Sequence, residues 1–526
     1  MTNRVNVNDL FQHAIEMDKA GQSAAAARHY HEILEIEPGH AYARYLLGVQ
    51  ALHQGQHDEA IRLIQGAIAH QPREATFHHF LGQALQANGD LEQAIVAYRK
   101  TLEIAPQHAA AQFRCGTALR SMHRLEEAEQ ALRVACQVNP FMSAACIQLG
   151  EVLQELGRHE EALNCYNQLL DSNPQLVPAY MHKGEILLSL NRFDEAQQNY
   201  RQLFVLQRGP GMNDAVFRQH TESSPGTDVQ PVQVLPFFIE NLSEHIDHLL
   251  ANNKLDASFT QAGKLLDVLL DKMSANSNEL LTLSPEQATL IRDFYDRALY
   301  ATNTRALAGD VINTSLDFQE IESTYLSAEL PMVHFDSFLT PEALQALYEF
   351  CLDATIFHRQ SHNGFLSSYV YEGFNCEILY RIAAELKQKF PRILGTRELR
   401  NMWVYRYPCQ GDGVRPHSDQ AAVTVNFWIT PDSANLDCEH GGLIIYDREQ
   451  PMDWDWYKTN QYKDSPEMLE KIDTFLQGAN TVTVPYRENR ALMFHSNLFH
   501  ASDCFTFREG YRNRRMNVTL LFGDRD

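Results

Sequence analysis

Three side chains in the last quarter of the chain have the types and spacing of a metal site. His417 and Asp419 lie two residues apart at the start of "HSDQAAVTVNFWIT", and His500 lies downstream in "FHSNLFHASD". On a strand, residues two apart point to the same face, so His417 and Asp419 should project together. Two imidazoles and one carboxylate on one face of a metal ion leave three positions open, which suits ferrous iron that must also bind a co-substrate and dioxygen. The sequence therefore predicts an Fe(II) site formed by His417, Asp419 and His500.

The pattern His-x-Asp is weak by itself, because it occurs twice more in this chain. His245 and Asp247 lie in a stretch with helical periodicity, where side chains two residues apart diverge. His334 and Asp336 lie on an earlier strand that no glycine loop precedes. Both pairs are expected to be ordinary polar residues.

The neighbours of the third pair distinguish it from the other two. Tyr407 lies ten residues before the histidine, and the loop "PCQGDGVRP" has glycines that let the chain turn back. In the last predicted strand, "NRRMNVTLLFG", Arg515, Asn517 and Thr519 share one face. An arginine on the inner face of such a strand suits a carboxylate at the bottom of a pocket. Arg514 is the alternative, but it would need the opposite face, which has an apolar packing pattern.

In these features, residues 332–523 resemble the 2-oxoglutarate-dependent Fe(II) oxygenases of the prolyl-hydroxylase type. The resemblance implies a double-stranded β-helix (jelly-roll) fold, with Fe(II) as cofactor, 2-oxoglutarate and O2 as co-substrates, and ascorbate as a stimulant. It favours His500 over His495 as the distal metal ligand, because His495 lies inside the "ALMFHS" strand, earlier than the histidine of that family.

The resemblance also assigns residues to the co-substrate. Tyr407 matches the tyrosine that contacts oxoglutarate in that family. Arg515 and Asn517 match its final-strand Arg-x-Ser, with asparagine in place of serine, so the second contact is open. Asn426 or Trp428 would line the pocket from the neighbouring strand. The stretch "HSDQAAVTVNFWITPDSANLD" also resembles a subgroup of bacterial oxygenases that carry tetratricopeptide repeats.

The first two hundred residues have a strict internal period. Three residue types recur every 34 positions: Pro38, Pro72, Pro106, Pro140 and Pro174; Gly48, Gly82, Gly116, Gly150 and Gly184; Ala26, Ala60, Ala94, Ala128, Ala162 and Ala196. Each period contains two amphipathic segments, with the small residues where two helices must approach closely. This pattern resembles the tetratricopeptide repeat, in about six copies over residues 7–208.

Arrays of this kind curve into a superhelix with a concave binding face. The first helix of each repeat should line that face, and the candidates are Arg44, Tyr45, His78, His79, Gln112 and Phe113. The alternative is that these residues have no binding role and are solvated or packed between repeats. The expected partner is a protein or peptide, held as substrate on the groove.

Composition narrows the class of protein. The 526 residues include 44 Lys and Arg against 67 Asp and Glu, a net charge of -23, which disfavours nucleic acid as a partner. The start has no apolar core typical of a signal peptide, and no run of about eighteen apolar residues is present, so we expect no membrane span. Nine scattered cysteines without a CxxC pair suggest reduced thiols and a cytoplasmic protein.

We therefore expect a multidomain α + β protein. Residues 1–208 should form an α-solenoid of repeats, residues 209–325 a linker and helical bridge, and residues 326–526 the β-domain. The aromatic-rich insert 448–480 is either a lid or a surface excursion that packs its own aromatic side chains.

Three functions are compatible with this organisation. The first is an Fe(II)- and 2-oxoglutarate-dependent dioxygenase that hydroxylates a side chain of a protein or peptide recruited by the repeats; collagen prolyl 3-hydroxylases and aspartyl β-hydroxylases similarly pair helical repeats with an oxygenase. The second is a hydroxylase of a free amino acid or another small molecule, with the repeats used for assembly. The third is a repeat scaffold that carries an inert barrel.

Overall fold

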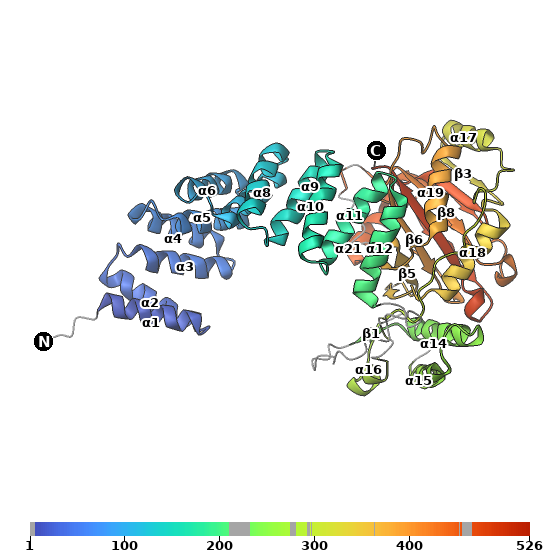
Figure 1. The fold of residues 1–526 in the computed structure, drawn as a ribbon, viewed down its shortest axis with the longest axis horizontal. Helices are drawn as coiled ribbons and strands as arrows, with labels where there is room; N and C mark the ends of the chain where they lie inside the picture. The colour runs from blue at the N-terminus through green and yellow to red at the C-terminus, as the bar shows by residue number, and fades with distance from the viewer. Residues whose placement is uncertain are drawn as a thin grey trace. The chain divides into compact units, whose positions relative to one another are not determined.

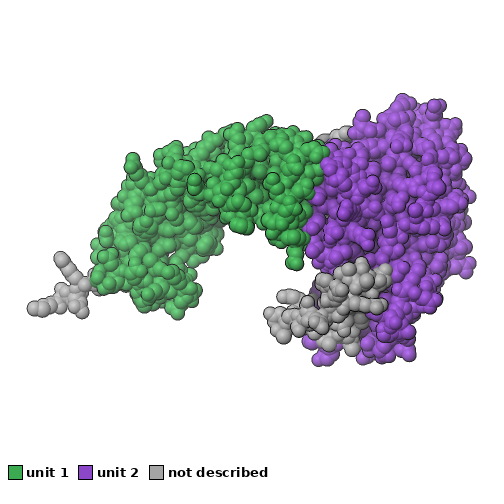
Figure 2. All heavy atoms as spheres, in the orientation of Figure 1, with its two compact units in different colours: residues 1–179 green, residues 180–526 purple. Residues whose placement is uncertain are grey.

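The computed structural model describes residues 6–209, 232–273, 280–291, 295, 297–361, 363–451, 453–454 and 465–525. Contacts divide the chain into two compact units, Met1–Ala179 and Tyr180–Asp526 (Figure 2). In the described ranges, we find no helix with the length and apolar character needed to cross a membrane.

Helical hairpins build the N-terminal region (Figure 1). Their helices are α1 (Val7–Lys19), α2 (Ser23–Ile36), α3 (Ala41–His53), α4 (His57–His70), α5 (Ala75–Ala87), α6 (Leu91–Ile104), α7 (Ala109–Ser121), α8 (Leu125–Val138), α9 (Ser143–Glu155), α10 (His159–Ser172), α11 (Val177–Ser189) and α12 (Phe193–Arg208). These twelve helices form six consecutive pairs, so the predicted helical repeat solenoid is confirmed.

The periodic small residues mark the closest approach of the two helices in a pair. A Cβ atom built on Gly82 would lie 2.4 Å from Cε1 of Tyr98, and one built on Gly48 would lie 2.6 Å from Cγ1 of Ile64. The periodic alanines, such as Ala60 and Ala94, are fully buried. Larger side chains would force the helices apart, which explains why these positions repeat with the period of the hairpin.

Half of the predicted groove residues are not on an open surface. Tyr45, His78 and His79 are buried, and the Tyr45 ring stacks on Phe77 with centroids 4.8 Å apart. Burial, with a smaller effect from His108, lowers the pKa of His79 to about 4. For these three residues the alternative of packing within the array is the correct one, whereas Arg44, Gln112 and Phe113 are half-buried.

The helix α12 belongs to the second unit by its contacts. The ring of Phe204 packs against Gly373, where an added Cβ would lie 2.6 Å from the phenylalanine Cε2. Asn375 Nδ2 donates a 2.9 Å hydrogen bond to the carbonyl oxygen of Gln197. The last predicted repeat is therefore part of the support for the sheet-rich region rather than a separate element.

The segment expected as a bridge also packs on the sheet-rich region. It contains β1 (Gln233–Val234), α14 (Pro236–Ala251), α15 (Thr260–Asp271), β2 (Leu281–Thr282), α16 (Pro285–Ile291) and α17 (Phe318–Ser327). On α14, His245 is buried, and its Nδ1 and Nε2 lie 2.7 Å from the Tyr511 hydroxyl and 2.8 Å from the Thr355 hydroxyl. The expected linker residues 210–231 lie outside the described residues.

Two antiparallel sheets form the C-terminal region. The larger has the order β3 (Met332–Phe335), β11 (Ala491–His495), β8 (Val423–Trp428), β14 (Met516–Phe522), β6 (Leu399–Arg406), β5 (Leu366–Tyr369) and β4 (Arg359–Gln360). The smaller has the order β10 (Thr481–Val484), β9 (Leu443–Glu449) and β12 (Leu498–Ser502), and β7 (Gln410–Gly411) pairs with β13 (Phe505–Thr506). The helices α18 (Pro341–Asp353) and α19 (Glu377–Lys389) belong to the same region.

The two sheets share one apolar core. Trp428 and Phe494 of the larger sheet are buried in the same cluster as Ile445 and Leu498 of the smaller. Strand β14 is buried along its whole length, including Asn517 and Thr519 on the face that the alternation of the sequence makes polar. On the far face of the larger sheet, Phe338 contacts Phe427 with ring centroids 5.1 Å apart.

Part of the aromatic insert packs on itself and on the smaller sheet. Trp454 lies against Phe475 of α21 (Pro466–Leu476) and against Phe499, at 5.2 and 6.3 Å between centroids. For Trp454, packing among the insert's own aromatics is therefore correct. Trp456, Tyr457 and Tyr462 lie outside the described residues, so a lid stays a prediction.

Candidate metal centre

Backbone pairing brings the predicted metal ligands together from two distant segments. His417 and His500 form an isolated antiparallel bridge, in which each N–H donates to the other's carbonyl oxygen at 3.0 and 2.8 Å. The Asp419 N–H donates to the Ser496 carbonyl oxygen at 3.0 Å. These bonds fix the register of the short loop before β8 against the hairpin that joins β11 and β12.

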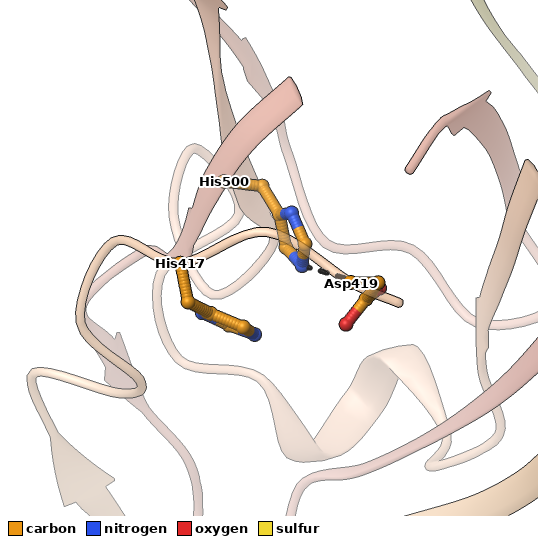
Figure 3. Close-up of side chains that lie close together, drawn as sticks. All are labelled: His417, Asp419 and His500. Carbon is orange, nitrogen blue, oxygen red and sulfur yellow. Dashed lines mark ion pairs between the residues drawn. The ribbon is translucent and has the colours of Figure 1, made fainter. Parts of the chain in front are cut away.

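The three side chains converge, as Figure 3 shows. The ligand atoms of His417, Asp419 and His500 all lie within 4.8 Å of one another. His500 Nε2 lies 3.5 Å from Asp419 Oδ2, and the two imidazole centroids are 4.3 Å apart. The sequence thus predicted a real convergence of two imidazoles and one carboxylate.

The backbone determines which nitrogen of each ring carries the lone pair. His417 Nδ1 lies 2.8 Å from the Arg415 carbonyl oxygen, and His500 Nδ1 lies 3.1 Å from that of Leu498. Because a carbonyl oxygen can only accept, each Nδ1 must carry the proton, and the lone pair is on Nε2. This is the tautomer in which a histidine binds a metal through Nε2.

The carboxylate is also held in place. Asp419 is buried, and its Oδ2 accepts a 2.8 Å hydrogen bond from the Thr424 hydroxyl. That hydroxyl lies 2.8 Å from the Ser496 hydroxyl, which completes a short buried chain. Such a network fixes the carboxylate orientation before any ligand binds.

Two cavities meet at this site. An inner cavity of about 20 Å³ lies between the sheets and is lined by the three converging side chains and by Tyr407, Thr424, Asn426, Asn517 and Thr519, among others. An outer cavity of about 650 Å³ shares His417 and Asp419 with it and opens past Tyr369, Trp403, Tyr405, Arg400 and Arg525. The triad therefore stands between a small interior cavity and a much larger opening, which Tyr369, Trp403 and Tyr405 help to line.

Arg515 lies beside the inner cavity. Its guanidinium is fully buried, and Cζ lies 4.4 Å from the centroid of the Tyr407 ring. It donates to the carbonyl oxygens of Gly441 and Gly442, at 2.7 and 3.2 Å, and to Asn517 Oδ1 at 3.4 Å. Among the residues that the structure describes, no carboxylate lies within ion-pair distance of it.

Arg514 points away from this site. Its guanidinium pairs with Glu240 and Glu244 of α14, at 2.5 and 3.0 Å. His495, the alternative distal ligand, lies 3.5 Å from Glu449 and is not in the converging group. Of the two arginines, only Arg515 reaches the residues that line the inner cavity.

The residues of the other two His-x-Asp pairs make packing and ion-pair contacts that support the fold. His245 packs in α14, as described above. Asp336 forms ion pairs with Arg487 and Arg490, each at 2.6 Å, and the bond from Arg490 is the main reason that its pKa is lowered. Neither pair belongs to a group of metal-ligating side chains in the described part of the chain.

The neighbouring strand β8 contributes Asn426 but not Trp428 to the inner cavity. Asn426 Nδ2 donates a 2.8 Å hydrogen bond to the Thr519 hydroxyl, while its buried Oδ1 has no hydrogen-bond partner among the described residues. Trp428 is buried in the apolar core against Tyr486, at 5.8 Å between centroids.

Several residues at the opening were missed by the sequence analysis. Trp403 and Tyr405 line both cavities, and burial raises the pKa of Tyr405 well above its usual range. The sequence did contain a pattern that predicts them. Alternate positions of one strand hold Trp403, Tyr405 and Tyr407, so the three side chains must share a face. Thr424 had no such signal, since only the fold brings its hydroxyl to Asp419.

Comparison with known proteins identifies the repeats. Tetratricopeptide-repeat family models match residues 19–84, 85–141 and 147–212. The N-terminal region therefore consists of tetratricopeptide repeats. No curated protein matched the sequence.

Solved structures of other repeat proteins are similar to part of the chain. A crystal structure of MamA is 24% identical, covering 30% of this chain and 91% of MamA at a TM-score of 0.29. YrrB, described as a TPR protein with an unusual peptide-binding site, is 19% identical, covering 34% and 93% at a TM-score of 0.32. A thermophilic TPR protein from Thermus thermophilus is 21% identical, covering 35% and 100% at a TM-score of 0.28.

Proposed function

We propose that the chain is an Fe(II)- and 2-oxoglutarate-dependent dioxygenase whose β-domain is a double-stranded β-helix. The observation that carries this proposal is the convergence of His417, Asp419 and His500 beside a buried arginine, Arg515, that has no carboxylate partner among the described residues. Two imidazoles and a carboxylate that converge suit a cation, and a buried guanidinium whose described hydrogen bonds all go to neutral oxygens suits an anionic ligand.

The donor set fits ferrous iron. Two nitrogen ligands and one oxygen ligand, with the lone pairs on Nε2, match the facial arrangement of non-haem iron sites. A metal with bonds of about 2.1 Å can span the 3.5 Å between His500 Nε2 and Asp419 Oδ2. When bound, iron and oxoglutarate would supply the activation of dioxygen that oxidises a substrate C–H bond.

The chain's own residues would hold the co-substrate. The Arg515 guanidinium would pair with the distal carboxylate of oxoglutarate, and the Tyr407 hydroxyl would donate a hydrogen bond to it. The inner cavity of about 20 Å³ has room for about one water molecule. Binding of a dicarboxylate therefore requires movement of lining side chains.

The aromatic opening would position the substrate and exclude water. The rings of Trp403 and Tyr405 lie 6.1 Å apart, and Tyr369 lies 5.6 Å from Trp403, so they form one wall beside the triad. Ser418, between the two ligands, donates a 2.8 Å hydrogen bond to Gln450 at the start of the insert.

We propose that the substrate is a side chain of a protein or peptide recruited by the repeats, because tetratricopeptide arrays form concave protein-binding faces. A second candidate is the hydroxylation of a small molecule. The outer cavity favours it, since its volume of about 650 Å³ lies in the range of small-ligand sites, roughly 300–1,000 Å³.

The test is succinate release by purified protein with Fe(II), ascorbate and oxoglutarate, against a panel of lysate peptides and metabolites. The proposal expects substrate-stimulated succinate in the wild type and none in His417→Ala. If the wild type binds neither iron nor oxoglutarate under anaerobic conditions, the oxygenase proposal is wrong and an inert scaffold is favoured.

A truncation separates the two substrate classes. The cut should precede α11, removing residues 1–174, because a cut at 208 would also remove α12 and its contacts with Gly373 and Asn375. Loss of peptide turnover with retained basal succinate formation supports recruitment by the repeats. Full turnover of a metabolite by the truncated protein supports the small-molecule alternative.

A further inference from the structure

A second group of metal-ligating side chains lies outside the proposed iron site. Ligand atoms of His440, Asp503 and Cys504 all lie within 4.8 Å of one another. His440 is in the turn before β9, and the other two residues follow β12. Backbone hydrogen bonds tie these segments together: the Asp503 N–H donates to Gly442 O at 3.2 Å, and the Gly441 N–H donates to Cys504 O at 2.8 Å.

The aspartate is buried in a way that calls for a ligand. Asp503 is 6% exposed. Its Oδ1 accepts a 2.8 Å hydrogen bond from the Cys504 N–H, but its buried Oδ2 has no hydrogen-bond partner among the described residues. A buried carboxylate oxygen without a partner is unfavourable, and a bound cation would satisfy it.

The histidine is oriented by a further carboxylate. His440 Nδ1 lies 2.9 Å from Asp437 Oδ2, so this nitrogen donates and the lone pair is on Nε2 in the neutral ring. A carboxylate behind a ligating imidazole is the usual outer partner of a zinc-binding histidine.

We propose that His440, Asp503 and Cys504 form a second metal site, selective for Zn²⁺ or a similar thiophilic divalent cation. The donor set explains the selectivity, because a thiolate favours zinc over Mg²⁺ and Ca²⁺, whereas the iron triad contains no sulfur. Three protein ligands leave the fourth tetrahedral position to water. Binding releases the thiol proton to solvent.

The site has a structural consequence for the arginine beside the iron triad. Gly441 and Gly442, whose carbonyl oxygens accept from Arg515, directly follow His440. An added Cβ on Gly442 would lie 1.8 Å from the Val484 carbonyl oxygen, so the segment fits tightly. A metal on His440 would anchor the loop that holds Arg515, whether or not the chain is an oxygenase.

The test uses the full-length protein, stripped with a chelator and titrated with Co²⁺ and Zn²⁺. We expect a thiolate-to-cobalt charge-transfer absorption in the near ultraviolet that Zn²⁺ displaces. Cys504→Ser should abolish it, whereas Cys438→Ser, at an exposed cysteine two residues before His440, should leave it intact. His417→Ala should also leave it intact, which separates this site from the iron triad.

Affinity provides the second measurement, and every protein compared, the reference included, carries His417→Ala so that Zn²⁺ does not bind at the iron triad. Asp437→Asn should weaken Zn²⁺ binding by about 10- to 100-fold, as is typical for loss of an outer partner. His440→Gln, on an exposed turn, should abolish tight binding without unfolding the protein. The proposal is wrong if Cys504→Ser and His440→Gln, both folded by circular dichroism, bind Zn²⁺ as tightly as the reference.

Discussion

The guanidinium of Arg515 lies over the aromatic ring of Tyr407, 4.4 Å from Cζ to the ring centroid, and the Tyr407 N–H donates a 3.0 Å hydrogen bond to the Arg515 carbonyl oxygen. The two residues were chosen from the sequence for separate reasons, one for its distance from His417 and the other for its strand face. Their contact brings the two residues expected to bind oxoglutarate together beside the inner cavity, which Tyr407 lines. The pair therefore provides a sharp test of the co-substrate proposal.

Arg515→Met should weaken oxoglutarate binding by about 2 kcal/mol or more, which is roughly 30-fold, because a buried ligand carboxylate would lose its charged partner. Arg514→Met is the matched control, since its guanidinium pairs with Glu240 and Glu244 outside the cavity. Anaerobic calorimetry with Mn²⁺ in place of iron would measure both. Equal weakening by the two variants would argue against Arg515 as the specific partner.

Thr424→Val should weaken metal binding by about 10- to 100-fold without removing a ligand. The Thr424 hydroxyl donates to Asp419 Oδ2, so its loss leaves the carboxylate less well oriented. Equilibrium dialysis of Mn²⁺ measures the affinity, and Asp419→Ala should show a larger loss. An unchanged affinity in Thr424→Val would mean that the hydrogen bond does not position the ligand.

The fold was predictable where the sequence has a period. The 34-residue step placed the helical hairpins, because each glycine and alanine meets a neighbouring helix at a fixed point, as Gly82 meets Tyr98. Alternation along the last strand correctly separated Arg515 from Arg514. By contrast, burial of His78 and His79 depends on packing between repeats, which the period of a single repeat does not determine.

The candidate site was predictable as a set of residue types but not as a network. The spacing of His417 and Asp419 indicated a shared face, whereas the bridge to His500 and the bond from Thr424 join residues that only the fold makes neighbours. The packing of α12 and α14 was not predictable for the same reason. Occupancy by iron stays a prediction.

Gly82→Ala should destabilise the repeat array by about 1–3 kcal/mol, because the new methyl group would overlap the fully buried ring of Tyr98. Gly39→Ala is the control, since its Cβ would lie 3.6 Å from the His70 ring, an ordinary contact. Thermal unfolding followed by circular dichroism would compare them. A melting temperature of Gly82→Ala equal to that of the control would contradict the close-approach explanation.

The buried His245 predicts an acid sensitivity of the second unit. Burial is the main reason that the pKa of His245 falls from 6.5 to about 3, and the positive charge of Arg406 adds to it. Between these pH values the unfolded chain binds a proton that the folded chain does not. The free energy of unfolding is therefore unaffected by this residue's titration above about pH 6.5. Below that, it decreases by about 1.4 kcal/mol for each pH unit until the pH reaches about 3.

His245→Gln removes this titration together with the hydrogen bonds to Tyr511 and Thr355. At pH 7.5 the variant should be less stable than the wild type by about 1–3 kcal/mol, the cost of buried partners left unsatisfied. At pH 5 the difference should shrink or reverse, because only the wild type is penalised by protonation of the unfolded histidine. Urea unfolding at both pH values measures this, and a stability difference that stays constant with pH would show that His245 does not titrate between the two states.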